Sequence, residues 1–121
     1  MSGASLLAGD IVLIIHIPRD DPSAVKARPA LVVSGSQFNK IGADVIVAPI
    51  SSNVRYGDPE QVVIQSSDPH FPQTGLRQSS AVKCGSIFAY SRAQVRRKIG
   101  VAHLEIVKEV RSIIINILTS D

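Results

Sequence analysis

The chain has 121 residues, of which 45% are hydrophobic, and a formal net charge of +3 at pH 7. This length predicts a single domain over residues 1–121 with a real hydrophobic core, and the composition excludes a disordered chain. The single cysteine, Cys84, excludes an internal disulfide and a zinc site built on several cysteines.

Residues 1–8 do not carry a basic segment followed by a long apolar run, so they lack the pattern of a signal peptide. No apolar run in the sequence approaches the length that crosses a bilayer. Together with the single cysteine, these features lead us to expect a cytoplasmic protein without membrane contacts.

The first expected strand covers residues 11–17, after the turn Gly9-Asp10. Nearly every position in it is apolar, which is typical of a strand covered on both faces. His16, near its end, is interpreted as a packed or rim residue, because the chain has only three histidines and they lie far apart in sequence. We therefore expect no metal site.

A polar loop over residues 18–27 follows, with prolines at positions 18 and 22. It is long for a hairpin connection, and long loops in compact domains are frequently functional. Its charged side chains either line a substrate groove or form surface ion pairs of little energetic value. These residues are Arg19, Asp20, Asp21 and Lys26.

Arg28 precedes a strand expected over residues 29–33, which Pro29 opens. We expect this arginine where the loop enters the core, a place where an unpaired buried guanidinium would be very costly. Its planar fork either binds an anion such as a phosphate or pairs with Asp20 or Asp21. The residues alone leave both interpretations open.

The middle of the chain predicts short strands separated by turns. The expected elements are a turn or short helix over residues 34–40, strands over 44–50, 61–65 and 80–89, and a loop over 66–78. Ser51 and Ser52 follow the first of these strands beside a turn, where hydroxyls commonly bond the local backbone. Gly85, inside the last strand, indicates a bulge or a close backbone approach.

The C-terminal part predicts helical structure. Ser91 is expected to cap a short basic helical turn that ends at Arg97. Over residues 102–119, apolar residues recur at helical spacing, which predicts a terminal helix packed on the sheet. The apolar positions are Leu104, Val107, Val110, Ile114 and Leu118. The run Ile113–Ile115 is wider than one buried stripe needs, which favours a dimer contact on a second face.

Five or six short, mostly antiparallel strands followed by a helix predict a mainly β fold, a small barrel. The segment over residues 71–100 contains six basic residues and no Asp or Glu; they are Arg77, Lys83, Arg92, Arg96, Arg97 and Lys98. Such a segment is typical of a surface that faces a polyanion, because each neutralised phosphate releases condensed counterions. A solvated face or a site for an acidic protein is the alternative.

Five blocks of the sequence resemble, in order and spacing, the MazF/PemK-type toxins, which are small ribosome-independent endoribonucleases of toxin–antitoxin pairs. The blocks are Gly9–Val12, Lys26–Val32, Ala48–Ser52, Thr74–Leu76 with Ser80–Cys84, and Lys98–Gly100. Each block is short, but together the matching segments extend over nearly the whole chain.

The resemblance implies an SH3-like barrel of the MazF/PemK/CcdB type with a C-terminal helix. It implies a homodimer with an RNA groove along its interface, and a cognate antitoxin whose disordered tail occupies that groove. DNA would be bound only through the antitoxin complex, and cleavage needs no metal or other cofactor. In this chemistry the ribose 2′-hydroxyl attacks the adjacent phosphate and leaves a cyclic phosphate and a 5′-hydroxyl.

In the family, the Arg of the Arg-Pro block and a Thr of the Pro-x-Thr block carry much of this chemistry, which implies Arg28 and Ser51 as catalytic residues. Arg28 would offer two donors to the scissile phosphate, and Ser51 keeps the hydroxyl of the threonine while losing its methyl group. The expected RNA-binding or supporting residues are His16, Asp21, Lys26, Ser52, His70, Arg77 and Lys83.

The sequence departs from the family pattern at two places. Many members have an Arg-Cys-Asp block in the late strand, whose Asp and Arg serve as base and acid in some of them. The block 83–85 reads Lys-Cys-Gly, so that carboxylate is missing. A His-Glu pair in the first loop is replaced by Pro22-Ser23, and this loop resembles the PemK-like branch.

The departures leave the general base open between Asp21, His16 and His70. An enzyme can also rely largely on charge stabilisation at the phosphate, with water taking the proton at a slower rate.

The leading prediction is a type II toxin that cleaves single-stranded RNA or mRNA in a sequence-selective, metal-independent way. The alternative is a weakened homologue that binds RNA or an antitoxin without turnover, which Gly85 favours. A gyrase poison of the same fold is a third reading, and the block Arg28–Val32 argues against it.

Overall fold

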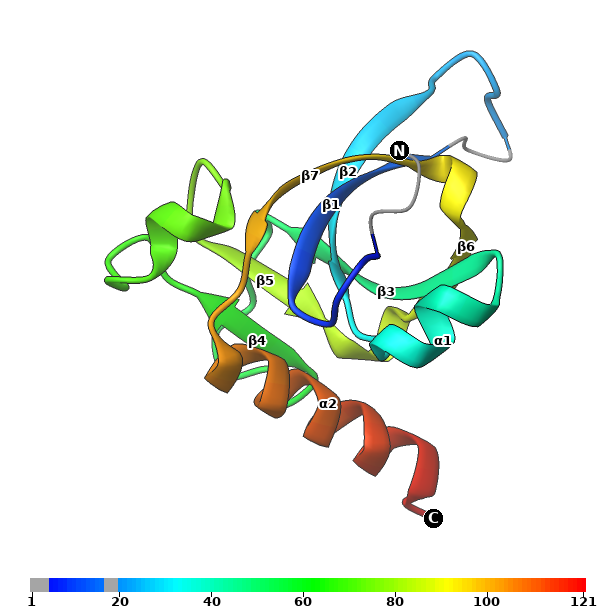
Figure 1. Cartoon of the computed structure of the whole chain (residues 1–121). Coiled ribbons are helices and arrows are strands. Elements are labelled where there is room, and N and C mark those ends of the chain that lie inside the picture. The colour runs from blue at the N-terminus through cyan, green and yellow to red at the C-terminus, as the bar shows by residue number, and fades with distance from the viewer. Residues whose placement is uncertain (1–4, 17–19) are drawn as a thin grey trace.

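The computed structural model describes residues 5–16 and 20–121, in which seven strands form a curled sheet with a C-terminal helix against it (Figure 1). The strands are β1 (Asp10–His16), β2 (Lys26–Val32), β3 (Asp44–Ser51), β4 (Gln61–Ile64), β5 (Ser80–Lys83), β6 (Phe88–Ser91) and β7 (Val95–Val101). The helical elements are α1 (Ser36–Ile41), η1 (Phe71–Thr74), η2 (Cys84–Ser86), η3 (Arg92–Gln94) and α2 (Leu104–Thr119). The predicted mainly β fold with a terminal helix is confirmed, with seven strands in place of five or six.

The strands follow the order β4-β5-β3-β2-β1-β7, and β6 pairs with β3 beside this path. All of these pairings are antiparallel. β3 is the central strand: its residues 44–47 pair with β6 and its residues 50–51 pair with β5, while residues 47–49 pair with β2.

Both faces of the central strands are buried. Ile11 and Leu31 belong to a cluster beneath α2, whereas their neighbours Val12 and Val32 belong to a second cluster on the other face of the sheet, and all four are 0% exposed. Successive strand residues point to opposite faces, so a strand that is covered twice needs an unbroken apolar sequence. This confirms the prediction for the first strand.

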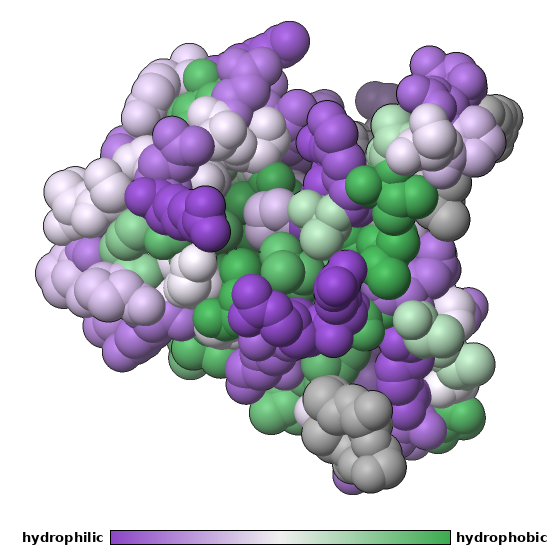
Figure 2. Space-filling view, turned by 90° about the horizontal axis from the view of Figure 1, so that it is seen from above, coloured by the Kyte–Doolittle hydropathy of each residue, from purple (hydrophilic) through white to green (hydrophobic). Residues whose placement is uncertain are grey.

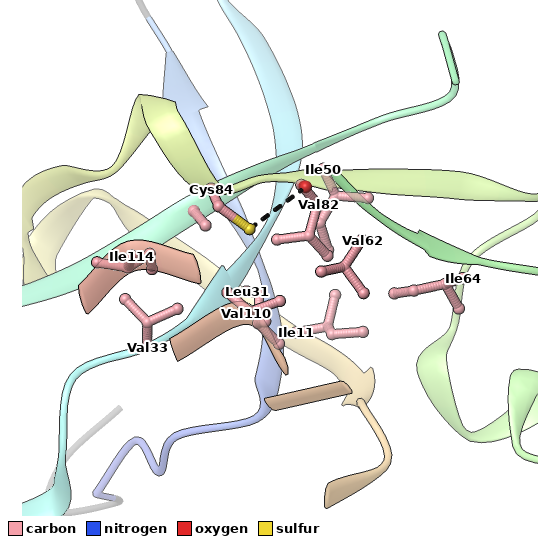
Figure 3. Packing of buried hydrophobic residues seen from close by; sticks show 11 residues of the cluster. Ile11, Leu31, Val33, Ile50, Val62, Ile64, Val82, Cys84, Val110 and Ile114 are labelled. Atoms are coloured by element: carbon pink, nitrogen blue, oxygen red, sulfur yellow. Dashed lines mark hydrogen bonds between the residues drawn. The ribbon is translucent and has the colours of Figure 1, made fainter. Parts of the chain in front are cut away.

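Helix α2 contributes Val110 and Ile114 to the first cluster, as Figure 3 shows, and also buries Val107. Burying each of these side chains contributes about 1.5–3 kcal/mol. The predicted helix is confirmed, but Leu104 and Leu118 are 61% and 70% exposed, because they lie in its first and last turns, beyond the cover of the sheet. Neither α2 nor any other helix in the described ranges is long and apolar enough to cross a bilayer.

The prediction of one strand over residues 80–89 is wrong. The chain forms β5, then the single turn η2 at Cys84–Ser86, and then β6. β5 and β6 both run antiparallel to β3, but Val82 lies opposite Ile50 and Phe88 lies opposite Val47. Six residues of this segment therefore pass three residues of β3, and the turn η2 takes up the surplus.

The expected loop position of Arg28 is also wrong, because β2 begins at Lys26 and Arg28 is part of the strand. Pairing with β3 starts only at Ala30, so within the described residues the segment 26–29 has β1 on one side and no strand on the other. Pro29 is tolerated there, since an edge position does not require its missing N–H. The same edge leaves Arg28 exposed.

The expected helical turn from Ser91 to Arg97 is only partly correct. Ser91 caps the short turn η3 through its side chain, with Gln94 completing a capping box, but the chain then enters strand β7. β7 pairs with β1 over residues far apart in sequence, with one-residue register shifts that leave Arg96 and Ile99 without a directly opposite partner. This nonlocal pairing overrides the local helical signal.

Candidate functional site

A groove of about 590 Å³ opens between the β1–β2 hairpin, the end of β3, the segment after η1, and β7. Its lining comprises Leu13, Lys26, Ala27, Arg28, Pro29, Ile50, Ser51, Ser52, Gly75, Leu76, Arg77, Gln78, Ser80, Arg97 and Ile99. Figure 2, which looks down from above Figure 1, shows hydrophilic residues gathered around a hollow with hydrophobic residues at its base.

The side chain of Arg28 has no carboxylate partner within the described residues. The ion pairs there are Lys98–Asp10 and Lys108–Glu105. The Asp21 carboxylate instead accepts hydrogen bonds from the backbone N–H and the hydroxyl of Ser23. Of the two interpretations of Arg28, pairing with Asp20 or Asp21 is therefore not the one observed, and its fork is open to an anion in the groove.

Ser51 is the last residue of β3 and lies opposite Ala81 of β5. Its hydroxyl oxygen accepts a hydrogen bond of 3.0 Å from the backbone N–H of Asn53, so the predicted local role is present. A serine hydroxyl also carries one hydrogen that it can donate. Ser51 can thus hold its turn and still donate to an oxygen in the groove, beside the exposed Ser52.

The segment after η1 crosses β7 in direct backbone contact. A Cβ atom on Gly75, whose φ is +73°, would overlap the carbonyl oxygen of Ile99, and a Cβ on Gly100 would overlap the backbone of Gln73 and Thr74. Only glycine allows so close an approach. The crossing fixes the position of the residues that follow it, including Arg77 in the groove wall.

The register shifts in β7 bring basic residues to the groove. Arg97 pairs with Leu13, and both line the groove, while Arg96 is the extra residue between Arg97 and Val95. A neighbouring hollow of about 330 Å³ shares Arg97 with the groove, and Arg92 and Arg96 line this second hollow as well. Positive charge therefore continues from the groove across β7.

The groove brings together five of the nine predicted site residues: Lys26, Arg28, Ser51, Ser52 and Arg77. Lys83 ends β5 opposite Gln61 and is not part of the lining. Asp21 lies exposed in the loop, outside the lining. The side chain of His16 lies outside the described residues.

His70 lies away from the groove. Its ring stacks on the ring of His103, with 4.0 Å between the ring centroids, and both line a separate small cavity beside α2. Sequence reasoning could not anticipate this contact, because the two histidines come from the loop before η1 and from the N-cap of α2.

Sequence reasoning did not single out Arg97 and Gln78 as site residues. Arg97 belongs to the basic segment over residues 71–100, so its charge was the available signal. Its place in the groove depends on the register of β7, which the expected helical turn concealed.

The electrostatics of the groove favour an anion. Its described lining includes four cationic side chains, from Lys26, Arg28, Arg77 and Arg97, and no Asp, Glu or His. Such a one-signed concave surface concentrates polyanions. Within the described residues, no group of three His, Cys, Asp or Glu side chains is arranged to hold a metal ion.

Cys84 is not a candidate nucleophile. It is 1% exposed, and burial together with the nearby Glu109 and Glu60 carboxylates raises the pKa of its thiol from 9.0 to about 11. The reactive thiolate is therefore scarce at neutral pH. This thiol packs in the core cluster (Figure 3).

The fold and the groove define a class: a small curled β-sheet protein with a C-terminal helix and a basic cleft. Solved structures with this fold include a MazE–MazF complex from Deinococcus radiodurans, with 20% identity, a TM-score of 0.77 and coverage of 98% of this chain and 99% of that chain. The Mycobacterium tuberculosis toxin MazF-mt6 has 24% identity and a TM-score of 0.67 over 91% of this chain and 98% of that chain. An endoribonuclease in complex with its cognate antitoxin, from Mycobacterial species, has 19% identity and a TM-score of 0.72 over 97% and 98%.

The family model for the PemK-like, MazF-like toxins of type II toxin–antitoxin systems matches residues 7–118, and the chain belongs to this family. No curated protein is similar enough in sequence to be matched to it. The family predicted from the five sequence blocks is therefore confirmed.

Proposed function

We propose that this toxin is a sequence-selective endoribonuclease that cleaves single-stranded RNA, including mRNA, without a metal ion. The observation that carries the proposal is the groove itself, where Arg28 and Ser51 lie in one cleft with three further cationic side chains. Arg28 would hold two nonbridging oxygens of the scissile phosphate, and Ser51 would donate one hydrogen bond.

The chemistry proceeds by attack of the ribose 2′-oxygen on phosphorus. The new O2′–P bond forms as the P–O5′ bond breaks, which leaves a 2′,3′-cyclic phosphate and a 5′-hydroxyl. A base takes the 2′-proton and an acid protonates the leaving oxygen. In this proposal water fills both roles at a slower rate, with Asp21, His16 and His70 as the alternative bases. The cations stabilise the charge that accumulates on the phosphate, which is the larger contribution to such catalysis.

The proposal includes partners that fit the same surface. A cognate antitoxin with an acidic, disordered segment would occupy the basic groove and block it. Two copies of the chain would form the active dimer, and DNA would be bound only through the antitoxin complex. Among the solved structures with this fold, one is an endoribonuclease in complex with its cognate antitoxin. We place the protein in the cytoplasm, where its RNA substrates are.

The test is cleavage of a long single-stranded RNA by the purified protein in EDTA, with mapping of cut sites and end chemistry. We expect discrete cuts with cyclic phosphate ends. Arg28→Ala removes the charged fork and is expected to slow cleavage by at least a hundredfold, roughly the loss of one oxyanion-stabilising donor. Ser51→Ala removes one hydrogen bond and is expected to slow it by about tenfold. Arg55→Ala, an exposed arginine outside the groove, is the control.

A second candidate is a toxin homologue that binds RNA or antitoxin without turnover. The absence of a carboxylate from the described groove lining favours it. A folded protein that binds RNA but makes no cuts would establish this second function. Retained cleavage in a folded Arg28→Ala protein would instead remove Arg28 from the mechanism.

A further inference from the structure

A second, smaller hollow adjoins the groove and shares two residues with it. Its volume is about 200 Å³, and Arg28 and Pro29 line both spaces. The remaining lining residues are Ile14, Ala30, Val47, Pro49, Ser86, Phe88 and Tyr90. Whatever enters this hollow therefore lies beside the guanidinium that the groove offers to a phosphate.

One wall of the hollow is aromatic. Phe88 and Tyr90 are two residues apart on β6, where they pair with Val47 and Val45 of β3, so their side chains share one face of the sheet. The ring centroids are 4.9 Å apart with 38° between the planes. Phe88 is 59% exposed, which is unusual for a phenylalanine and leaves much of the residue accessible to a ligand.

The chemistry of the hollow fits one flat ring system with a polar edge. Most of its lining residues are apolar, and Arg28 and Ser86 add hydrogen-bond donors. The volume is below the range of about 300–1,000 Å³ that holds a drug-sized molecule, so the occupant is small. Single-stranded RNA offers such a group next to each phosphate, because unstacked bases bind to aromatic side chains.

We infer that this hollow binds the base of a nucleotide adjoining the phosphate held by Arg28, with Phe88 as the stacking side chain and Tyr90 supporting it. The inference rests on the proposed function, since it needs RNA in the groove. It assigns a base-binding subsite to β6, on the face of the strand that carries Phe88 and Tyr90. Arg28 then links phosphate binding to base binding.

The test combines an abasic scan of the RNA with variants of Phe88. Binding is measured by fluorescence anisotropy with a 2′-O-methyl oligonucleotide, which has no free 2′-hydroxyl and is not cleaved. Single abasic nucleotides are placed at each position in turn. For the wild-type protein, we expect one position at which losing the base weakens binding by about tenfold or more, the usual loss for one base–aromatic stack.

Phe88→Ala is expected to weaken binding of the intact oligonucleotide by about the same factor and to abolish the further effect of the abasic nucleotide. This nonadditivity identifies the base and the ring as partners. Phe88→Leu, which retains apolar area but no ring, should behave like Phe88→Ala. Tyr56→Ala, another exposed aromatic residue that does not line the hollow, is the control. Thermal unfolding of each variant verifies that it is folded.

The outcomes separate this inference from the proposed function. Unchanged RNA binding by folded Phe88→Ala would overturn the inference even if cleavage is observed. Coupling between Phe88 and one base in a protein that never cuts RNA would support the inference and reject the nuclease. If Phe88→Ala leaves RNA binding intact but changes the sedimenting mass or the affinity for an acidic antitoxin peptide, the hollow is a protein contact and the inference is wrong.

Discussion

The groove and an acidic corner of the molecule carry opposite charges. This corner lies between β5 and α2 and comprises the surroundings of Cys84 and Gly85, with Glu60 and Glu109. The described lining of the groove has four cationic side chains and no carboxylate. At the corner, the Glu60 and Glu109 carboxylates lie close enough to Cys84 to raise the pKa of its thiol. A Cβ atom on Gly85 would come within 2.8 Å of Oε1 of Glu60.

The distance between the groove and this corner bears on the family's Asp that Gly85 replaces in this sequence. The space beside Gly85 is occupied by the Glu60 side chain and borders Ile117 of α2. Neither Glu60 nor Lys83 lines the groove. The charged side chains in the described groove lining are therefore all cationic. The Glu60 and Glu109 carboxylates lie instead near Cys84 of the core cluster.

The largest expected effect comes from detaching the groove wall from β7. Gly100→Ala places a methyl group against the backbone of Gln73 and Thr74. We expect it to lower the free energy of unfolding by about 3 kcal/mol, measured by urea denaturation, because the backbone cannot yield as a side chain would. Gly35→Ala, where a Cβ would contact nothing within 4 Å, should lower the free energy of unfolding by no more than about 1 kcal/mol, the cost of alanine at an N-cap. Equal free energies of unfolding for the two variants would mean that the segment after η1 does not pack tightly against β7.

The second prediction tests whether the groove works through its charge. Replacing Arg77 and Arg97 together by Gln is expected to weaken binding of a noncleavable single-stranded RNA by about tenfold or more. The slope of log K against log salt concentration should fall by about 1.4, or roughly 0.7 for each lost phosphate contact. Arg55→Gln should leave the slope unchanged. If the double variant binds RNA more weakly but the slope is unchanged, the substitutions have altered the shape of the groove and not its contacts with phosphates.

The third prediction concerns the acidic corner at high pH. The folded protein keeps the Cys84 proton up to a pKa of about 11, whereas the unfolded chain releases it near 9.0. The unfolded state then binds fewer protons, so this contribution to stability is fully present below pH 9 and is lost as the pH rises towards 11. We expect the wild type to lose about 1 kcal/mol more stability than Cys84→Ala between pH 8 and pH 10. If the free energies of unfolding of the wild type and Cys84→Ala fall in parallel with pH, the pKa of the Cys84 thiol is not raised.

The smallest effect is expected from restoring a carboxylate at the late strand. Gly85→Asp would direct its side chain towards Glu60 and α2, so we expect the RNA cleavage rate to stay within about twofold of the wild type. Glu60→Gln should leave the rate unchanged as well and serves as the matched control. A marked gain in rate with Gly85→Asp would show that the corner and the groove act as one site, against the separation described above.

The elements that sequence reasoning predicted are those whose signals are local. The apolar run after Asp10 and the helical spacing around Val110 depend only on nearby residues, and both elements form where expected. Arg28 and Ser51 were singled out by short blocks, and the groove contains both. The predictions that failed depend on long-range pairing. β7 exists because β1 lies beside it, and the break at Gly85 reflects the different registers in which β5 and β6 pair with β3. The exposure of Phe88 could not be predicted either, because it depends on where β6 lies in the sheet.

The two register shifts in β7 have a consequence for changes in its length. From Asp10 to Ile14, β1 advances by four residues, while β7 covers six from Val101 to Val95, because Ile99 and Arg96 are extra. At each shift two residues of β7 oppose one residue of β1, so the residues beyond it still point to the same face as their partners. Loss of Ile99 or Arg96 alone would therefore restore regular pairing at that point and leave Val95 facing the same way as Ile14. Homologous chains should accordingly be able to gain or lose single residues at these two places.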